Sequence, residues 1–374
     1  MKRNWLIFGL IFVMLVVLVA CAGSQRTRRG GRAGGGGRTY GGGGGKAVVE
    51  NLAPGRYTVN VDNHEVSTPM MANKIERGSA DITRAIFVIP AVGRNVGGQF
   101  HKFNRLAQEK GMENETLIVG MQFLYAQDVR AYEVDDNVLY WDEHGWSAGD
   151  LSTIESDLPR PVQISSFTIL DSAVAQVIDE FPNVNTIIVT GNSAGSKFTS
   201  RYAAGTRMPE QHPDINFGFI SSNGGTFIYM TPERPQEGSI DSWFTPNEAD
   251  CEKYNDYPMG LEHLNEYQSQ RGADDIRQTF ATRNYVFFIG SLDTRPDQPY
   301  CAFMIQGPNR LERNKAYWNY LQYYYGPSIK DHFHFHIIEG AEHSGPTYDT
   351  EIGKFYLFDW VPGDASTYEY EDDM

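Results

Sequence analysis

The pentapeptide Gly-Asn-Ser-Ala-Gly at residues 191–195 combines residue types that could do chemistry. It lies between the apolar run 185–190, which has strand character, and a helix-like segment. A serine between a strand and a helix occupies a tight, strained turn, and glycines two residues away on either side avoid steric clashes. The turn lifts the Ser193 hydroxyl above the sheet edge and directs helix N-terminal amides into the same space. Ser193 is therefore a candidate nucleophile, and an ordinary Gly/Ser turn is the alternative.

A serine nucleophile requires a histidine that takes its proton and a carboxylate that orients the histidine. After a turn of this kind, the acid and then the histidine are expected further along the chain. Asp293 follows the apolar run 284–291, and His343 lies in the loop after the run 332–338. We therefore predict a catalytic triad of Ser193, His343 and Asp293. The alternatives are that Asp297 is the acid, that Asp293 caps a turn, or that His343 is a surface residue.

An oxyanion formed at Ser193 would need backbone N–H donors. One should come from the residue after the nucleophile and one from the loop after an early strand, here residues 88–98. The predicted donors are the N–H groups of Ala194 and of Val92 or Gly93. The side chains of Arg94 and Asn95 could position substrate, and for Arg94 a surface salt bridge is the alternative.

Three histidines alternate along one apolar run, at His332, His334 and His336, and would share one face of a strand. The spacing is compatible with a metal site. No acidic or cysteine pattern accompanies it, so we interpret these histidines as part of a partly exposed strand face. We expect no metal, and the predicted chemistry requires no organic cofactor.

The elements that must position these residues are short apolar runs that alternate with helical segments. Strands are predicted at 83–90, 116–124, 185–190, 215–222, 284–291 and 332–338, and helices at 100–111, 165–182 and 309–326. Continuous apolar runs are typical of strands buried on both faces. The pattern predicts the α/β class, with a mostly parallel central sheet and helices on both faces. Residues 55–63 alternate as an outer strand or hairpin arm would.

Residues 223 to about 283 do not follow this alternation of strands and helices. They are rich in Pro, Gly, Asn and aromatic residues, and their apolar residues show no clear period. We predict a small lid-like insertion over the carboxyl edge of the sheet, and not a separately folding domain. Its aromatic residues would either line a substrate cleft or pack beneath the lid. They are Trp243, Phe244, Tyr254 and Tyr257.

The first 21 residues read as an export signal, with Lys2 and Arg3 before an apolar run that ends in Leu-Val-Ala-Cys. This run resembles a bacterial lipoprotein signal, which implies cleavage before Cys21 and lipid attachment there; an uncleaved anchor helix is the alternative. Residues 22–46 are rich in glycine and arginine and predict a flexible linker, although the arginines could touch anionic lipid or nucleic acid. The folded domain would then be residues 47–374, at the cell envelope and facing the periplasm or the exterior.

Charge and cysteine content narrow the choice of partners. The 374 residues include 32 basic and 47 acidic ones, and residues 1–46 hold eight basic and no acidic residues, which leaves the remainder near −23. An acidic surface repels polyanions, which argues against a nucleic-acid partner for the folded domain. Cys251 and Cys301 would form a disulfide in an oxidising compartment, or remain two buried thiols. We expect a monomer.

Residues 83–360 resemble the α/β-hydrolase superfamily of serine esterase and lipase type, in particular secreted or lipid-anchored bacterial hydrolases of undefined substrate. Besides the 191–195 turn, the resemblance rests on GRN at 93–95, WSAGD at 146–150, SSFTILD at 165–171, NSAGSKFTSRYA at 192–203, YND at 254–256, GLE at 260–262 and QGPNRLERN at 306–314. It implies the same triad, attack on an acyl carbon, and a Cys251–Cys301 disulfide that holds the insertion near the acid loop. Two departures concern the oxyanion geometry: Pro90-Ala91 replaces a common His-Gly, and Ser196 replaces a common glycine.

These features predict a membrane-anchored, extracytoplasmic serine hydrolase that cleaves carboxylic esters through an acyl-enzyme. The substrate would be a small-molecule or polymer ester. A peptidase or an acyltransferase on the same fold is one alternative, since fold does not fix function. A non-catalytic, lipid-anchored binding protein is the other.

Overall fold

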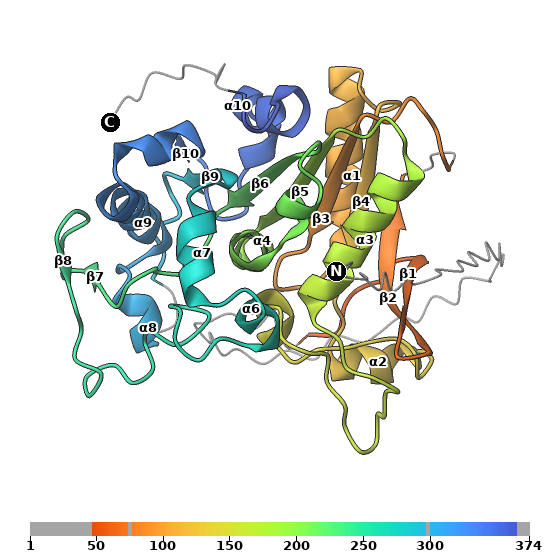
Figure 1. The fold of residues 1–374 in the computed structure, drawn as a ribbon, viewed down its shortest axis with the longest axis horizontal. Coiled ribbons are helices and arrows are strands. Elements are labelled where there is room, and N and C mark those ends of the chain that lie inside the picture. Colours follow the sequence, from red (N-terminus) through yellow and green to blue (C-terminus); the bar gives the residue numbers. More distant parts are fainter. Residues whose placement is uncertain (1–46, 74–76, 297–299, 365–374) are drawn as a thin grey trace, which may run out of the picture. The chain divides into compact units, whose positions relative to one another are not determined.

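The computed structural model describes residues 47–73, 77–296 and 300–364 (Figure 1). The predicted signal with Cys21, the predicted linker at 22–46 and the rival acid Asp297 lie outside these residues. Within the described part of the chain, no helix has the length and apolar character that crossing a membrane requires.

An eight-stranded sheet forms the centre of the fold, in the order β1-β2-β4-β3-β5-β6-β9-β10. Its strands are β1 (Gly55–Val61), β2 (His64–Ala72), β3 (Arg84–Ile89), β4 (Thr116–Met121), β5 (Thr186–Asn192), β6 (Asn216–Ser222), β9 (Asn284–Gly290) and β10 (Phe333–Ile338). The six strands from β4 to β10 along this order pair in parallel, and the β1–β2 hairpin adds to β4 in antiparallel fashion. Each predicted apolar run is one of the parallel strands, which confirms the α/β prediction.

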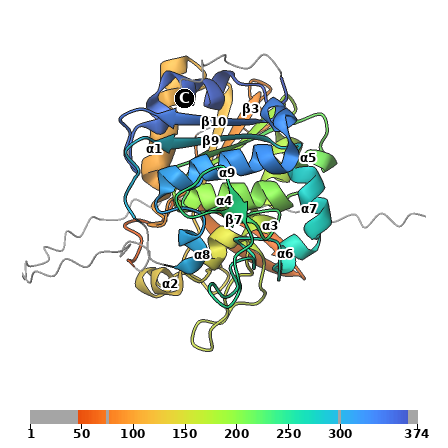
Figure 2. The same ribbon diagram turned by 90° about the vertical axis from the view of Figure 1, so that its left-hand side faces the viewer.

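Helices cover both faces of the sheet because its side chains alternate between two apolar layers. Ile86 and Val88 of β3 face α1 (Val96–Lys110) and the C-terminal α10 (Glu351–Lys354) with its π-helical extension η4 (Phe355–Asp359). Ala85 and Phe87 face the opposite layer. That layer consists of α3 (Ser166–Glu180), α4 (Ala194–Gly205), α7 (Ala273–Phe280) and α9 (Arg310–Tyr325) (Figure 2).

Local sequence signals explain where these helices begin and end. Ser165 caps α3 by accepting a hydrogen bond from the N–H of Phe167, and Asn309 caps α9 in the same way. Gly111 ends α1 at a φ of 70°, which glycine adopts without strain. The shorter elements are α2 (Ala126–Tyr132), η1 (Gly145–Ala148), α5 (Met208–Gln211), β7 (Arg234–Pro235), β8 (Trp243–Phe244), α6 (Glu266–Ser269), α8 (Cys301–Met304), η2 (Pro327–Asp331) and η3 (Thr347–Asp349).

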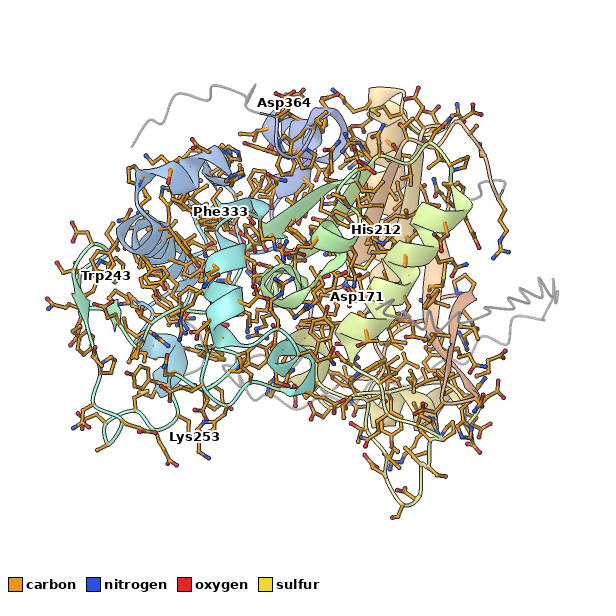
Figure 3. The ribbon with its side chains drawn as sticks, viewed as in Figure 1. Asp171, His212, Trp243, Lys253, Phe333 and Asp364 are labelled. Atoms are coloured by element: carbon orange, nitrogen blue, oxygen red, sulfur yellow. A yellow bond between two sulfur atoms is a disulfide. The ribbon has the colours of Figure 1, made fainter. Side chains whose placement is uncertain are left out.

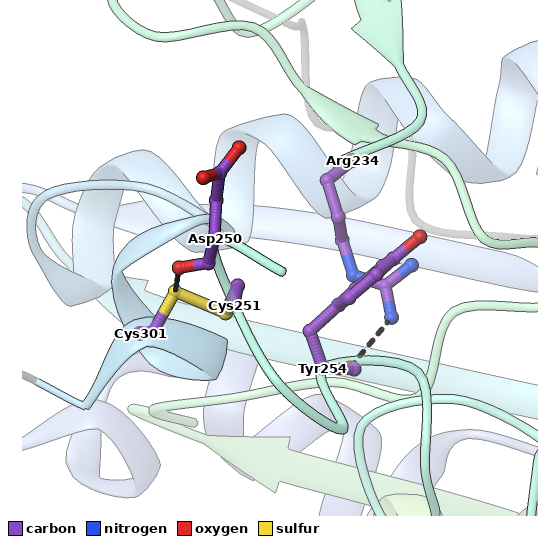
Figure 4. The surroundings of a disulfide bond; sticks show 5 residues. All are labelled: Arg234, Asp250, Cys251, Tyr254 and Cys301. Carbon is purple, nitrogen blue, oxygen red and sulfur yellow. Dashed lines mark hydrogen bonds between the residues drawn. A yellow bond between two sulfur atoms is a disulfide. The ribbon is translucent and has the colours of Figure 1, made fainter. Parts of the chain in front are cut away.

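The predicted insertion, residues 223 to about 283, includes α7 and is therefore itself part of the helical layer. Trp243, which is labelled in Figure 3, packs on two tyrosines of α9, and Tyr254 and Tyr257 are mostly buried. The interpretation as ordinary packing therefore holds for these three, whereas Phe244 is exposed. Cys251 and Cys301 form a disulfide, so the alternative of two free thiols is wrong (Figure 4).

Asp171 of α3 provides a further link between the insertion and the helical layer. Its carboxylate accepts hydrogen bonds from the hydroxyl groups of Tyr202 in α4, of Thr206 directly after α4 and of Tyr267 in α6. Burial raises the pKa of Asp171 to about 6. The three hydroxyl donors satisfy the oxygens of a carboxylate that has little access to water.

Candidate active site

Ser193 is the single residue between the end of β5 at Asn192 and the start of α4 at Ala194. Its backbone has a φ of 59° and a ψ of −109°, which is a strained conformation for a residue with a side chain. A Cβ on Gly195 would lie 2.4 Å from the carbonyl oxygen of Ile89, and a Cβ on Gly191 would lie 2.5 Å from the backbone of Gly195. Both glycines are therefore required for a turn this tight. The prediction of a strained turn at Ser193, from here on called the elbow, is confirmed.

The three residues of the predicted triad meet in the structure. His343 Nε2 lies 2.9 Å from Ser193 Oγ, and His343 Nδ1 lies 2.8 Å from Asp293 Oδ2. A neutral imidazole protonated on Nδ1 satisfies both contacts, since it donates to the carboxylate and accepts from the hydroxyl. The Asp293 side chain is 1% exposed and that of His343 30% exposed, so the carboxylate is shielded while the imidazole is accessible.

The sheet explains why residues so far apart in the sequence meet. β5, β9 and β10 run parallel, and their carboxyl ends lie at the same edge of the sheet. Asp293 follows β9, where its N–H donates to the carbonyl of Gly290. Arg310 at the start of α9 places Nη1 3.4 Å from the other carboxylate oxygen of Asp293. The sequence analysis did not anticipate this cation.

The loop that carries two of the predicted oxyanion donors begins next to the Ser193 turn. The carbonyl oxygens of Ile89 and Pro90 approach the Cα of Gly195, so the loop that follows β3 begins beside the first turn of α4. Among the described residues, the N–H groups of Val92, Gly93 and Ala194 donate no hydrogen bond to another protein group. Backbone N–H groups without a protein acceptor are able to bind an anion.

The prediction that Arg94 positions substrate, or forms a surface salt bridge, is wrong. Arg94 and Asp128 are both fully buried, and the guanidinium makes three contacts of 3.0–3.1 Å with the two carboxylate oxygens. It also stacks 3.5 Å from the ring centre of Tyr125 and donates to the carbonyl of Val92. The side-chain oxygen of Asn95 accepts a hydrogen bond from the N–H of Glu50. This side chain is therefore also bonded within the protein.

Asn223 is a residue of the site that the sequence analysis missed. It is fully buried directly after β6, with a positive φ of 52°. Its side-chain oxygen accepts from the N–H of Gly290 in β9, and its side-chain nitrogen donates to Asn192 beside Ser193. The same nitrogen lies 3.3 Å from the hydroxyl of Thr347 in the segment that follows His343. Asn223 thus connects the three chain segments that carry the triad.

The three histidines of the β10 region do not form a metal site. His336 Nε2 lies 3.0 Å from the hydroxyl of Tyr356, and both His334 and His336 pack near that ring under the C-terminal helices. Burial lowers the pKa of His334 to about 4 and that of His336 to about 3, and a neighbouring histidine adds to each effect. In the part of the chain that the structure describes, no group of three or more His, Cys, Asp or Glu could hold a metal ion.

Comparisons with known proteins found similar solved structures but no matching family or curated sequence. No protein-family model matches the chain. No curated protein matches its sequence. A poly(3-hydroxybutyrate) depolymerase from Bordetella parapertussis is similar in structure, with a TM-score of 0.50 and 16% identity over 82% of this chain and 92% of that one. Poly(aspartic acid) hydrolase-1 from Sphingomonas sp. KT-1 gives a TM-score of 0.48 and 18% identity over 78% and 95% of the two chains.

At this level of identity the similarity is one of fold. Together with the sheet order and the strained Ser193 turn, it shows that the chain has the α/β-hydrolase fold, as the motifs predicted.

Proposed function

We propose that this chain is a serine hydrolase that cleaves carboxylic esters through an acyl-enzyme. The observation that carries the proposal is the continuous contact from Ser193 Oγ through His343 to the buried carboxylate of Asp293. A serine on a strained elbow without a base would be a turn, whereas a serine in contact with an oriented imidazole has a path for its proton.

In the first half of the reaction, Ser193 Oγ attacks the carbonyl carbon of the ester while His343 Nε2 takes the hydroxyl proton. Asp293 keeps the imidazole in the Nδ1–H tautomer and stabilises the imidazolium that forms. The negative charge moves to the former carbonyl oxygen, where the N–H groups of Ala194 and of Val92 or Gly93 would bind it. Each such donor contributes roughly 3 kcal/mol to transition-state stabilisation in comparable sites.

The tetrahedral intermediate then collapses, the alcohol leaves with the proton from His343, and Ser193 holds the acyl group. In the second half, His343 takes a proton from water, the hydroxide attacks the acyl carbon, and Ser193 recovers its proton. The products are a carboxylic acid and an alcohol. Every proton passes through His343 Nε2, and none of these steps requires a metal or an organic cofactor.

Labelling with a fluorophosphonate probe tests the proposal, because the probe reacts with an activated serine. We expect the wild-type protein to be labelled, and Ser193→Ala and His343→Ala to be unlabelled. In a panel of p-nitrophenyl esters of increasing chain length, the wild-type protein should hydrolyse esters, and the two variants should not. Equal labelling of all three proteins, or labelled protein without turnover of any ester, would reject the esterase assignment.

We also propose that the enzyme is attached to a membrane through a lipid on Cys21 and works outside the cytoplasm. The proposal rests on the lipoprotein-like sequence before Cys21. In a bacterial host that receives labelled palmitate, wild-type protein should become labelled and membrane-bound, and Cys21→Ser should not be labelled. A wild-type protein that is membrane-bound without the label would instead support the anchor-helix alternative.

A further inference from the structure

The segment 47–53, here named the strap, is hydrogen-bonded to the loop 91–95 that follows β3. Arg94 Nη2 donates to the carbonyl of Ala47 over 2.8 Å. The N–H of Glu50 donates to the side-chain oxygen of Asn95 over 2.9 Å. Two consecutive residues of the loop are therefore bonded to the strap through its backbone.

Gln122, which follows β4, links the same two segments. Its side-chain oxygen accepts from the N–H of Ala53, and its side-chain nitrogen donates to the carbonyl of Asn51. The same nitrogen also lies 3.0 Å from the carbonyl oxygen of Arg94. Gln122 is fully buried, so its amide has few solvent partners that could replace these contacts.

Val49 holds the middle of the strap in place. Its side chain is 2% exposed and packs in an apolar cluster with Leu124 and Tyr140. Its N–H donates to Asp128, which is the carboxylate that pairs with Arg94. The strap is therefore anchored by apolar contacts and by the buried ion pair together.

The loop 91–95 has little apolar burial of its own. Val92 is 38% exposed, and Arg94 is the one fully buried residue of the five. Arg94 adopts a positive φ of 56°, its N–H closes a turn onto Ala91, and its guanidinium holds the carbonyl of Val92. The direction of the Val92 and Gly93 amides thus depends on how Arg94 is held.

We propose that the strap is a positioning element of the active site, which fixes the loop 91–95 so that its amides point to the space above Ser193. This inference rests on the proposed function, since the amides matter only if an oxyanion forms there. The segment that leads into the domain would then contribute to turnover although it does not touch the substrate.

Two substitutions remove the same bond from opposite sides. Glu50→Pro removes the N–H donor, and Glu50→Ala is its control because it keeps the N–H. Asn95→Ala removes the acceptor, and it deletes no helix cap, because the Asn95 side chain makes no capping hydrogen bond with α1. Asn183→Ala, which removes an exposed asparagine contact to Ala80, is the control for Asn95→Ala.

The measurements are kcat, KM and the pH profile of kcat/KM on the full chain, well below the unfolding temperature of each variant. We expect Glu50→Pro and Asn95→Ala each to lower kcat about tenfold with KM within about twofold, and the double variant to be no worse than either one. The pH profile of kcat/KM should keep its shape, because the His343 contacts are untouched. Wild-type kcat in Asn95→Ala, or additive losses in the double variant, would overturn the inference. If the wild-type protein hydrolyses no ester, the proposed function fails instead.

Discussion

At the scale of single residues, the close approach of the chain after β3 to the first turn of α4 requires a glycine at position 195. A methyl group on Gly195 would lie 2.4 Å from the carbonyl oxygen of Ile89 and 2.9 Å from that of Pro90. Backbone atoms cannot move away as a flexible side chain would, so we expect Gly195→Ala to destabilise the fold by about 1–3 kcal/mol. Gly98→Ala is the matched control, because Gly98 lies in α1 and its Cβ would meet nothing within 4 Å.

Thermal and urea unfolding measure this difference. Gly98→Ala should be neutral or more stable by up to about 1 kcal/mol, since alanine favours a helix over glycine. The expectation fails if the two variants unfold at the same urea concentration.

Asn223 supports a second prediction at this scale. Asn223→Ala removes the bonds to Gly290, Asn192 and Thr347, and should lower kcat by roughly 10- to 100-fold with little change in KM, because small displacements of reacting groups are costly. Asn63→Ala is the control, since Asn63 also has a positive φ, of 65°, but lies in the β1–β2 turn. Steady-state kinetics should show normal kcat for Asn63→Ala. Equal kcat values in both variants would mean that Asn223 serves the fold alone.

The sequence predicted the residues whose role follows from a local pattern. Ser193 stands between a strand and a helix, and Asp293 and His343 each follow an apolar run, so their meeting could be inferred from a parallel sheet. Arg94 and Asn223 could not be interpreted in this way. The partner of Arg94 is Asp128, 34 residues away, and nothing near either residue marks the pair as buried.

At the scale of elements, the sequence predicted the parallel strands because each is a short run that is apolar on both faces. The start of α1 was less predictable, since the helix begins at Val96 and not near Phe100. Gly97 and Gly98 weaken the local helical signal. Tertiary packing overrides it, because Val96 fills the space over Gly120, where a Cβ would lie 2.6 Å from the Val96 side chain.

The contact between β10 and the C-terminal helices predicts acid sensitivity. Burial lowers the pKa of His336 to about 3 and that of His334 to about 4, so the unfolded chain binds more protons than the folded one between about pH 4 and 6.5. Folding stability therefore rises with pH across this window and is lost as pH falls. We expect His336→Gln to reduce the loss of stability between pH 7 and pH 4.5 by about 2–3 kcal/mol.

Urea unfolding at both pH values measures the effect, with His64→Gln, an exposed residue of β2, as the control. At pH 7, His336→Gln should itself be less stable, because the bond to Tyr356 is lost. The interpretation requires that His336→Gln changes the slope of the unfolding free energy against pH, and that His64→Gln does not.

At the scale of the whole molecule, the parallel sheet brings Ser193, Asp293 and His343 together, and a disulfide links the predicted insertion to the segment after Asp293. The Cys251–Cys301 disulfide joins the insertion to α8, eight residues beyond Asp293, across a separation of 50 residues. Closing a loop of that length removes chain entropy from the unfolded state worth at most about 4 kcal/mol. The resemblance predicted this pairing, whereas composition alone left two free thiols open.

We therefore expect Cys251→Ser with Cys301→Ser to lower the melting temperature by several degrees and to make it insensitive to dithiothreitol. Wild-type protein should lose a similar amount of stability when reduced. Asp293 is held by β9 and by Arg310, not by the disulfide, so kcat of the folded double variant should stay within a fewfold of wild type. Scanning calorimetry with and without reductant, together with ester turnover at low temperature, separates the two effects. A double variant that melts at the same temperature as the oxidised wild type would show that the disulfide adds no stability. A double variant that folds but loses ester turnover would mean that the insertion helps to position Asp293.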